Sequence, residues 1–161
     1  MHYIIDANNL AGVLGILFED DFDEKLVGII KDYNKGKSKK ISLVFDSADN
    51  MGDKYSIGNI DVIYTPRDNY YKSADDKIIE LLKNICENLK NKDEVVVITD
   101  DIELRELAKK ASEKNRNVYF QKATDFAIKL NKNLYSQGYG DEKINDDEIK
   151  KINDDLLRLW T

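Results

Sequence analysis

The stretch YKSADDKIIELLKNICENLKNKDEVVVITDDIE, residues Tyr71–Glu103, decides how this chain folds. Near its end, the β-branched run Val95–Ile98 predicts a buried strand, because strands covered on both faces are apolar throughout. Apolar residues at helical spacing fill the middle of the stretch and predict a helix. Acidic residues stand at the start of this helix and just after the strand: Asp75, Asp76, Asp100, Asp101 and Glu103.

Two other predicted strands also end on an aspartate. They are Tyr3–Asp6 and Ile41–Asp46. The carboxyl ends of parallel strands share one edge of their sheet, and open α/β sheets bind ligands in the crevice beyond that edge. We therefore expect Asp6, Asp46 and the acids that follow Ile98 to lie together at one edge of one sheet.

Strands alternate with helices along the chain, which predicts an α/β fold. We expect a mostly parallel five-stranded sheet with helices on both faces, in three α/β/α layers. The five strands are expected at residues 2–6, 41–46, 60–65, 94–99 and 117–120. The first helix is expected at Leu10–Phe18, with Asn8 or Asn9 as its N-cap. In the helix after the fourth strand, we expect the apolar side chains to point inward: Leu104, Leu107, Ala108 and Ala111.

The polar segment 47–59 contains two glycines and predicts a loop, and its start beside Asp46 makes it a candidate lid or substrate guide. Because 13 residues are near the lower limit for a parallel crossover, the direction of the strand at 60–65 stays open. We expect one domain over residues 1–135. Residues 136–161 are expected to form a linker and an amphipathic helix, Asp146–Trp160, that packs back on the domain.

The composition narrows the classes of function. The chain has 161 residues and a net charge of −6, so it is not a general nucleic-acid coat protein, which needs a surplus of basic residues. Its one cysteine, Cys86, excludes a disulfide framework, and its one histidine, His2, leaves little basis for Ser-His or Cys-His catalysis. No segment resembles a signal peptide or a membrane span, so we expect a cytoplasmic protein without a membrane partner.

The acids are informative as a set. Taken singly, each also has a structural explanation, as a helix cap or as a first-turn residue that complements the helix dipole. Together, two carboxylates about 4 Å apart repel by about 4 kcal/mol at an effective dielectric constant near 20. No lysine or arginine adjoins Asp6, Asp46 or Asp101, and Lys77 points away from Asp76 along the helix. A divalent cation would relieve this repulsion, and ligation by oxygen alone selects Mg²⁺ or Mn²⁺.

Such a cation is typical of phosphoryl chemistry. The sequence contains no GxxxxGK[ST] phosphate-binding loop, which argues against a nucleoside triphosphate as substrate. The substrate is then expected to be a phosphodiester or a phosphomonoester.

Four motifs, in order, resemble those of the PIN-like nucleases. They are Ile4–Leu10, Val44–Asp46, Ser73–Glu80 and Val97–Glu103. The resemblance covers residues 1–130 and is strongest to the NYN domains, in particular to the YacP-type bacterial ribonucleases. One departure is Ser73, which stands where flap endonucleases have a glutamate, so a full two-metal site does not follow. Segment 47–59 matches no family pattern.

The resemblance implies a metal-dependent endoribonuclease with a carboxylate-held Mg²⁺ or Mn²⁺. The implied catalytic residues are Asp6, Asp75, Asp76 and Asp101. The implied metal-binding residues are Asp6, Asp46, Asp76, Asp101 and Glu103, of which Asp6, Asp76 and Asp101 would bind directly. The implied supporting residues are Asn8, Asn9, Thr99 and Asp100.

The expected substrate is single-stranded RNA, and a ribosome or protein partner is a further expectation from the resemblance. Basic residues near the acids in the sequence are candidates for contacts with RNA phosphates: Arg67, Lys72, Lys77 and Arg105. Tyr70 and Tyr71 are candidates for stacking on unpaired bases. Core packing for the tyrosines and a solvated surface for the basic residues are the structural alternatives.

Three other functions are considered. A receiver-like phospho-acceptor domain would use Thr99 and Lys122, but it does not explain Asp75 and Asp76. A phosphatase of the haloacid-dehalogenase type needs an aspartate where Asn8 stands. A catalytically inactive module that binds RNA or protein would not need to keep so many mutually repelling acids.

Overall fold

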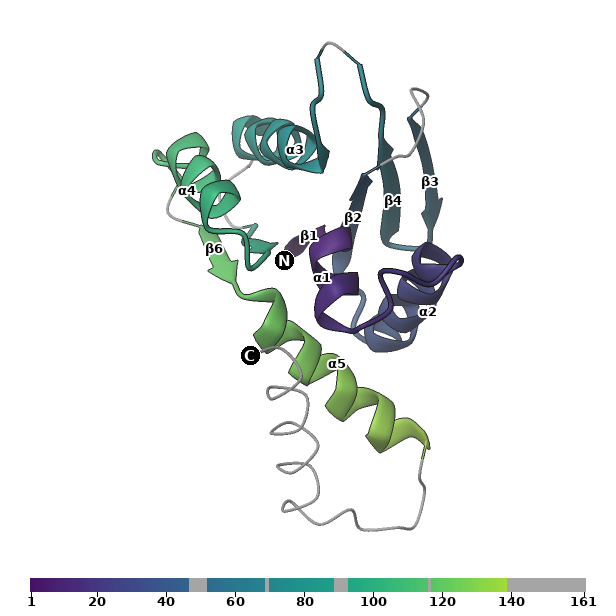
Figure 1. Ribbon diagram of the computed structural model, residues 1–161. Helices are drawn as coiled ribbons and strands as arrows, with labels where there is room; N and C mark the ends of the chain where they lie inside the picture. The colour runs from purple at the N-terminus through teal and green to yellow at the C-terminus, as the bar shows by residue number, and fades with distance from the viewer. Residues whose placement is uncertain (47–51, 69, 89–92, 116, 139–161) are drawn as a thin grey trace.

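A single six-stranded sheet forms the centre of the molecule in the computed structural model, which describes residues 1–46, 52–68, 70–88, 93–115 and 117–138 (Figure 1). The strands are β1 (His2–Asp6), β2 (Lys40–Asp46), β3 (Asp53–Ile57), β4 (Ile60–Thr65), β5 (Val95–Ile98) and β6 (Val118–Gln121). The helices are α1 (Ala7–Val13), α2 (Phe22–Asn34), α3 (Ala74–Asn88), α4 (Ile102–Ala111) and α5 (Ala123–Gly138). The predicted α/β fold with helices on both faces is confirmed, but the sheet has six strands and not the predicted five, because Asp53–Ile57 add an edge strand. The expected C-terminal helix lies outside the described residues.

The strand order is β3-β4-β2-β1-β5-β6, and every neighbouring pair except β3 and β4 is parallel. Strand β1 is therefore flanked by β2 and β5. Asp6 pairs with Val44, and Ile5 pairs with Ile98, so the carboxyl ends of these three strands meet at one edge. The predicted convergence of the strand ends is thus present in the fold.

The polar segment before β4 was expected to be a loop, and that expectation is wrong for Asp53–Ile57. These residues form the edge strand β3, which runs antiparallel to β4 and is mostly exposed. Gly58, with φ of 57°, begins the two-residue turn between them, a position that glycine fills without strain. The antiparallel strand returns the chain along the sheet, which explains how 13 residues suffice to bring β4 parallel to β2.

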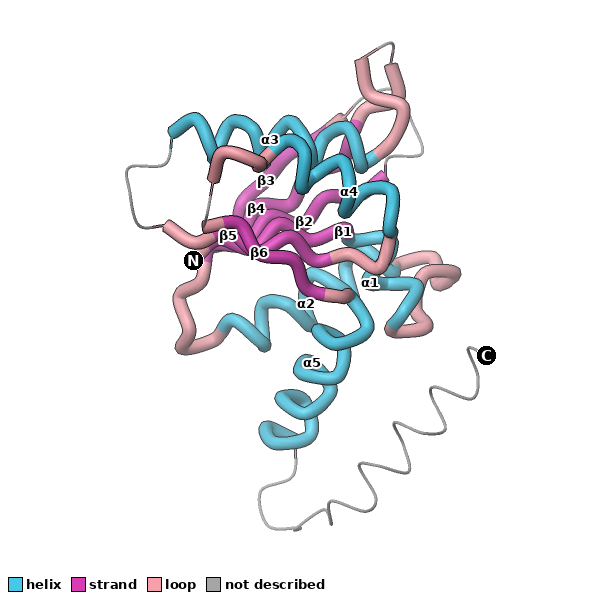
Figure 2. Tube along the Cα trace, turned by 90° about the vertical axis from the view of Figure 1, so that its left-hand side faces the viewer, coloured by secondary structure: helices cyan, strands magenta, loops and turns pink. Residues whose placement is uncertain are grey.

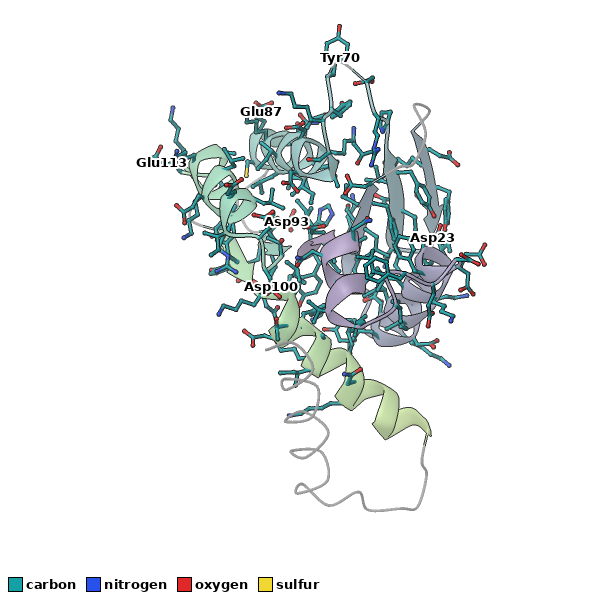
Figure 3. The ribbon with its side chains drawn as sticks, viewed as in Figure 1. Asp23, Tyr70, Glu87, Asp93, Asp100 and Glu113 are labelled. Atoms are coloured by element: carbon teal, nitrogen blue, oxygen red, sulfur yellow. The ribbon has the colours of Figure 1, made fainter. Side chains whose placement is uncertain are left out.

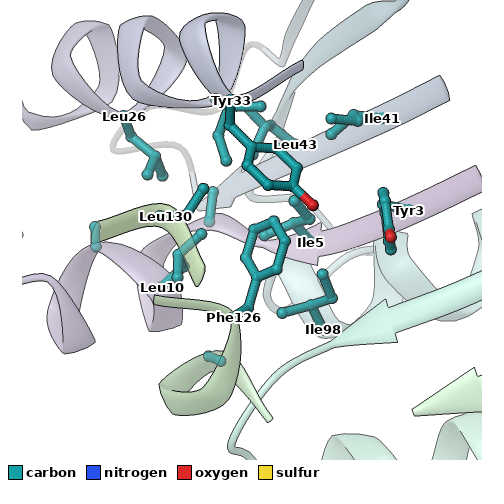
Figure 4. Close-up of a cluster of buried hydrophobic side chains, with 14 of the residues drawn as sticks. Tyr3, Ile5, Leu10, Leu26, Tyr33, Ile41, Leu43, Ile98, Phe126 and Leu130 are labelled. Carbon is teal, nitrogen blue, oxygen red and sulfur yellow. The ribbon is translucent and has the colours of Figure 1, made fainter. Parts of the chain in front are cut away.

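Two hydrophobic cores fill the two sides of the sheet. Helices α1, α2 and α5 cover one side, and α3 and α4 cover the other (Figure 2). In β1 the side chains alternate between them, with Tyr3 and Ile5 in the first core and Ile4 in the second. In the first core, Phe126 of α5 packs edge-on against Tyr33 of α2, at 5.2 Å between ring centroids (Figure 4). Helices thus cover both faces of the sheet, so we expect a functional site at one of its edges.

Two local expectations were wrong. The first helix begins at Ala7, not at Leu10, because Asp6 caps it and neither Asn8 nor Asn9 does. Leu107 was expected to point inward but is 52% exposed, whereas Leu104 and Ala108 of the same helix are fully buried. The helix presents a narrower apolar face to the sheet than its composition indicates.

We expect Gly52→Ala to destabilise the protein by about 1–3 kcal/mol, because the added Cβ overpacks a tight contact. That Cβ would lie 2.5 Å from Cδ of Pro66 and 2.7 Å from the carbonyl oxygen of Tyr64. The matched control is Gly28→Ala in α2, where the added Cβ would meet no described atom within 4 Å beyond its chain neighbours and its own helix backbone, and alanine should stabilise the helix by up to about 1 kcal/mol. Urea denaturation of the two variants measures both changes, and equal stabilities would contradict the close approach at Gly52.

Candidate active site

Asp6 is the buried centre of the acidic edge. It ends β1, is 7% exposed and caps α1, since Oδ1 accepts a hydrogen bond of 3.3 Å from the amide of Asn9. The other oxygen, Oδ2, accepts a hydrogen bond of 3.1 Å from the hydroxyl of Thr99, at the end of β5. The Thr99 hydroxyl in turn accepts from the amide of Asp101 at 3.0 Å. Thr99, itself fully buried, therefore joins Asp6 to the turn that carries Asp101.

Asp101 caps the next helix on the same edge. Its Oδ1 accepts a hydrogen bond of 3.1 Å from the amide of Leu104 in the first turn of α4. Asp46, at the end of β2, does the same for α3, and its Oδ1 lies 2.6 Å from the amide nitrogen of Ala74. Of the helices that begin at this edge, α1, α3 and α4 are thus each held by an aspartate at or just after a strand end.

Asn8 and Asn9 tie the neighbouring strands to the end of β1. Oδ1 of Asn8 accepts a hydrogen bond of 3.0 Å from the amide of Asp46, and Oδ1 of Asn9 accepts one of 2.8 Å from the amide of Asp100. Each asparagine fixes the backbone of one flanking strand end relative to Asp6. Both residues were predicted to support the site, and the structure places both there.

The carboxylates of this edge interact with one another. Burial raises the pKa of Asp6 to about 7, and the charges of Asp75 and Asp46 add to the rise, against the hydrogen bonds from Asn9 and Thr99 that lower it. Burial also raises the pKa of Asp75 to about 6. The negative charges that contribute to this second rise belong to Asp101, Asp46, Asp76 and Glu103. Asp75 is therefore close enough to four other acids for their charges to raise its pKa.

Asp75 and Asp76 differ in their surroundings although they are adjacent. Asp75 is half-buried among the acids, whereas Asp76 is exposed and its Oδ2 accepts a hydrogen bond of 2.7 Å from the amide of Lys72. Successive residues on a helix point about 100° apart, so one of them faces the edge and the other faces the loop before α3. The structure thus favours Asp75 for the inward position that the sequence analysis gave to Asp76. Glu103 is exposed in the first turn of α4.

Asp100 faces a different element. Its carboxylate accepts hydrogen bonds from the hydroxyl of Thr124 at 2.5 Å and from the amide of Thr124 at 3.3 Å, at the start of α5 (Figure 3). It was predicted to support the site, and that role stays a prediction; in the structure its carboxylate ties the start of α5 to the end of β5. Thr124 was not singled out in the sequence, because no motif marks it.

The candidate substrate residues are dispersed. Arg67 and Lys72 are exposed on the loop between β4 and α3, and Tyr70 is 87% exposed at its tip (Figure 3). Lys77 and Tyr71 both contact Glu80, Lys77 through an ion pair of 3.2 Å and Tyr71 through its hydroxyl. The contact of Tyr71 therefore anchors the loop on α3, whereas the ion pair of Lys77 lies within α3.

Arg105 and Thr65 contain buried polar atoms without a partner. Arg105 donates a hydrogen bond of 3.1 Å to the carbonyl oxygen of Thr99, and its Nε has no partner in the described structure. Thr65 of β4 lies opposite Asp46 of β2 in the sheet register. Its buried hydroxyl likewise has no hydrogen-bond partner in the described structure. Both residues adjoin the acidic edge, where buried groups of this kind commonly bind an ordered water or an ion.

His2 and Ser42 lie at the opposite edge. Nε2 of His2 is 2.8 Å from the hydroxyl of Ser42, near the amino ends of β1 and β2. Burial, followed by the positive charge of Lys40, lowers the pKa of His2 to about 4, so the ring is neutral at pH 7. No acid of the site is near this pair in the strand register, so the histidine takes no part in the acidic edge.

The chemistry of the candidate metal ligands fits a hard divalent cation. Every candidate ligand is an oxygen, and no ion pair among the described residues neutralises Asp6, Asp46, Asp75 or Asp101. In the described residues, however, no three His, Cys, Asp or Glu side chains are close enough to hold one ion as they stand. Mg²⁺ keeps several waters and needs only one or two direct carboxylates, so this spacing is compatible with ligation partly through water.

The three-layer sheet and its acidic edge define a PIN-like domain. The structure resembles the crystal structure of a mutant of Rae1 (YacP) from Bacillus subtilis, with a TM-score of 0.60 and 15% sequence identity over 98% of each chain. The model of the YacP-like NYN domain family matches residues 4–154, and the chain belongs to this family. A search of the curated proteins found no match.

The family indicates a nuclease domain and thereby disfavours the receiver-like and phosphatase alternatives. Among the described residues, no helix is long and apolar enough to cross a membrane.

In EDTA, we expect the stability of the wild-type protein to fall as the pH rises from 5 to 8. The pKa of Asp6 is about 7 in the folded protein and 3.8 ordinarily, so the stability that its proton provides is complete below pH 3.8 and is lost as the pH passes about 7. The loss is at most about 4 kcal/mol. Asp6→Asn keeps the hydrogen-bond acceptor and should show a smaller loss in thermal denaturation. Identical pH profiles for the two proteins would contradict the raised pKa.

Proposed function

We propose that this chain is an endoribonuclease that depends on Mg²⁺ or Mn²⁺ and cleaves single-stranded RNA in the cytoplasm. The observation that carries the proposal is the mutual repulsion of Asp6, Asp46, Asp75 and Asp101 at the edge where three parallel strands end. Membership of a family that indicates nucleases supports it. A ribosome or another protein as partner in this activity is part of the proposal by resemblance alone.

The acids would divide the work of binding the cation. We assign direct contact to Asp6 and Asp75, and contact through water to Asp76, Asp101 and Glu103. When bound, the cation would neutralise charge on the phosphodiester and lower the pKa of an attacking water. Thr99 and the two asparagines hold the strand ends in place, which keeps the carboxylates at one edge of the sheet.

The exposed loop between β4 and α3 would bind the RNA. Arg67 and Lys72 are free to approach phosphates, and the exposed ring of Tyr70 offers a surface on which an unpaired base can stack. The contact of Tyr71 with Glu80 anchors the end of this loop on α3, the helix that carries Asp75. A single strand suits this surface better than a duplex, because stacking needs an unpaired base.

We expect Asp75→Asn to lower the rate of RNA cleavage in Mn²⁺ at least about 100-fold, because it removes a direct carboxylate contact with the cation. Asp76→Asn should lower the rate less than about tenfold, since its carboxylate acts through water or on the loop. Cleavage of fluorescently labelled single-stranded RNA, with and without EDTA, measures both.

Asp20→Asn is the control for the loss of one exposed acid and should cleave like the wild-type protein. If the wild-type protein binds the labelled RNA but does not cleave it in either metal, the chain is an RNA-binding module and the proposal is wrong. If Asp76→Asn is the more damaging of the two substitutions, the assignment of Asp75 is wrong.

A further inference from the structure

We propose that Asp46 is a positioning residue that fixes the start of α3, and through it Asp75, and that Asp46 does not bind the cation itself. This inference rests on the proposed function for its catalytic meaning. It assigns to Asp46 a role different from that of a metal ligand, which the sequence implied.

Asp46 is held on both its backbone and its side chain. Its amide donates to Asn8 at 3.0 Å, and its Oδ1 accepts from the amide of Ala74 at 2.6 Å. The first contact ties Asp46 to the end of β1, and the second ties it to the first residue of α3. Asp46 is therefore a bridge from the centre of the sheet to the helix that carries Asp75.

The amide of Ala74 needs an acceptor from outside its helix. The first four amides of a helix have no intrahelical partner, and Ala74 is 2% exposed, so little water reaches it. A carboxylate acceptor makes a strong, charge-assisted hydrogen bond with such an amide. Oδ1 of Asp46 is therefore already engaged as the acceptor for the start of α3.

This contact sets where Asp75 lies. Asp75 follows Ala74 directly, about 1.5 Å further along the helix axis. The hydroxyl of Ser73 accepts from the amide of Asp75 at 3.3 Å, but Ser73 belongs to the preceding loop and not to the sheet. Among the described hydrogen bonds, the contact between Asp46 and Ala74 is the one that joins the sheet to the first turn of α3.

The test compares Asp46→Asn with Asp46→Ala. Asparagine keeps an oxygen that can accept from Ala74 but has no charge, whereas alanine removes both. Two quantities are measured: the hydrogen-exchange rate of the Ala74 amide by NMR in EDTA, and the Kd for Mn²⁺ by electron paramagnetic resonance. Asp23→Ala is the control, because it removes a first-turn acid of α2 whose carboxylate accepts a hydrogen bond from the hydroxyl of Tyr64.

A positioning role predicts that only alanine is damaging. Asp46→Ala should speed exchange of the Ala74 amide at least about tenfold and weaken Mn²⁺ binding about tenfold or more, as second-shell substitutions do. Asp46→Asn should stay within about threefold of the wild-type protein in both quantities, and Asp23→Ala should change neither.

Two results would overturn the inference. If both Asp46 variants lose Mn²⁺ affinity equally while Asp46→Asn keeps the Ala74 amide protected, then Asp46 is a ligand. If Asp46→Ala leaves the exchange of Ala74 unchanged, the bridge does not hold the helix. If the wild-type protein binds no Mn²⁺, the proposed function fails on its own, and amide exchange alone decides whether Asp46 positions α3.

Discussion

Carboxylates at one edge of this sheet repel one another, and the amides at the starts of three helices keep them there. Asp6 holds α1, Asp46 holds α3 and Asp101 holds α4. The partial positive charge of a helix start favours an adjacent anion, so each helix offsets some of the repulsion that the strand ends create. Burial raises the pKa values of Asp6 and Asp75, and the charges of the neighbouring acids add to both rises. The negative charge gathered at this edge is the basis on which we propose a cation there.

Much of this architecture could be predicted because short local patterns in the sequence indicate it. The run Val95–Ile98 is apolar throughout, which indicates a strand covered on both faces, and an acid follows it at once. The same pattern ends β1 and β2, and parallel strands place such ends together without any further information. Hydrogen bonds in the structure link the predicted acids at the strand ends to Thr99, Asn8 and Asn9.

The features that the sequence did not predict depend on long-range packing, which the periodicity of apolar residues does not encode. Strand β3 is mostly exposed, so no alternation of apolar residues marks it, although the Gly58-Asn59 pair before β4 is a hairpin signal that could have revealed it. Whether Asp75 or Asp76 faces the edge depends on the rotation of α3 about its axis, which the bond from Asp46 to Ala74 sets from a distant part of the chain. The link between Asp100 and Thr124 is likewise a long-range contact between two ordinary residue types.

The hairpin that returns the chain from β2 to β4 has a practical consequence. Its turn adjoins the pair formed by Ile41 and Ile60, near the amino ends of the strands, whereas the carboxylates gather at the other end. Apart from Gly58 itself and its two chain neighbours, no described atom lies within 4 Å of the Cβ position at Gly58, so the tip of the turn is sterically open. A fluorescent label or an affinity tag inserted there would leave the acidic edge untouched. The fold thus provides an attachment point at a full strand length from its chemistry.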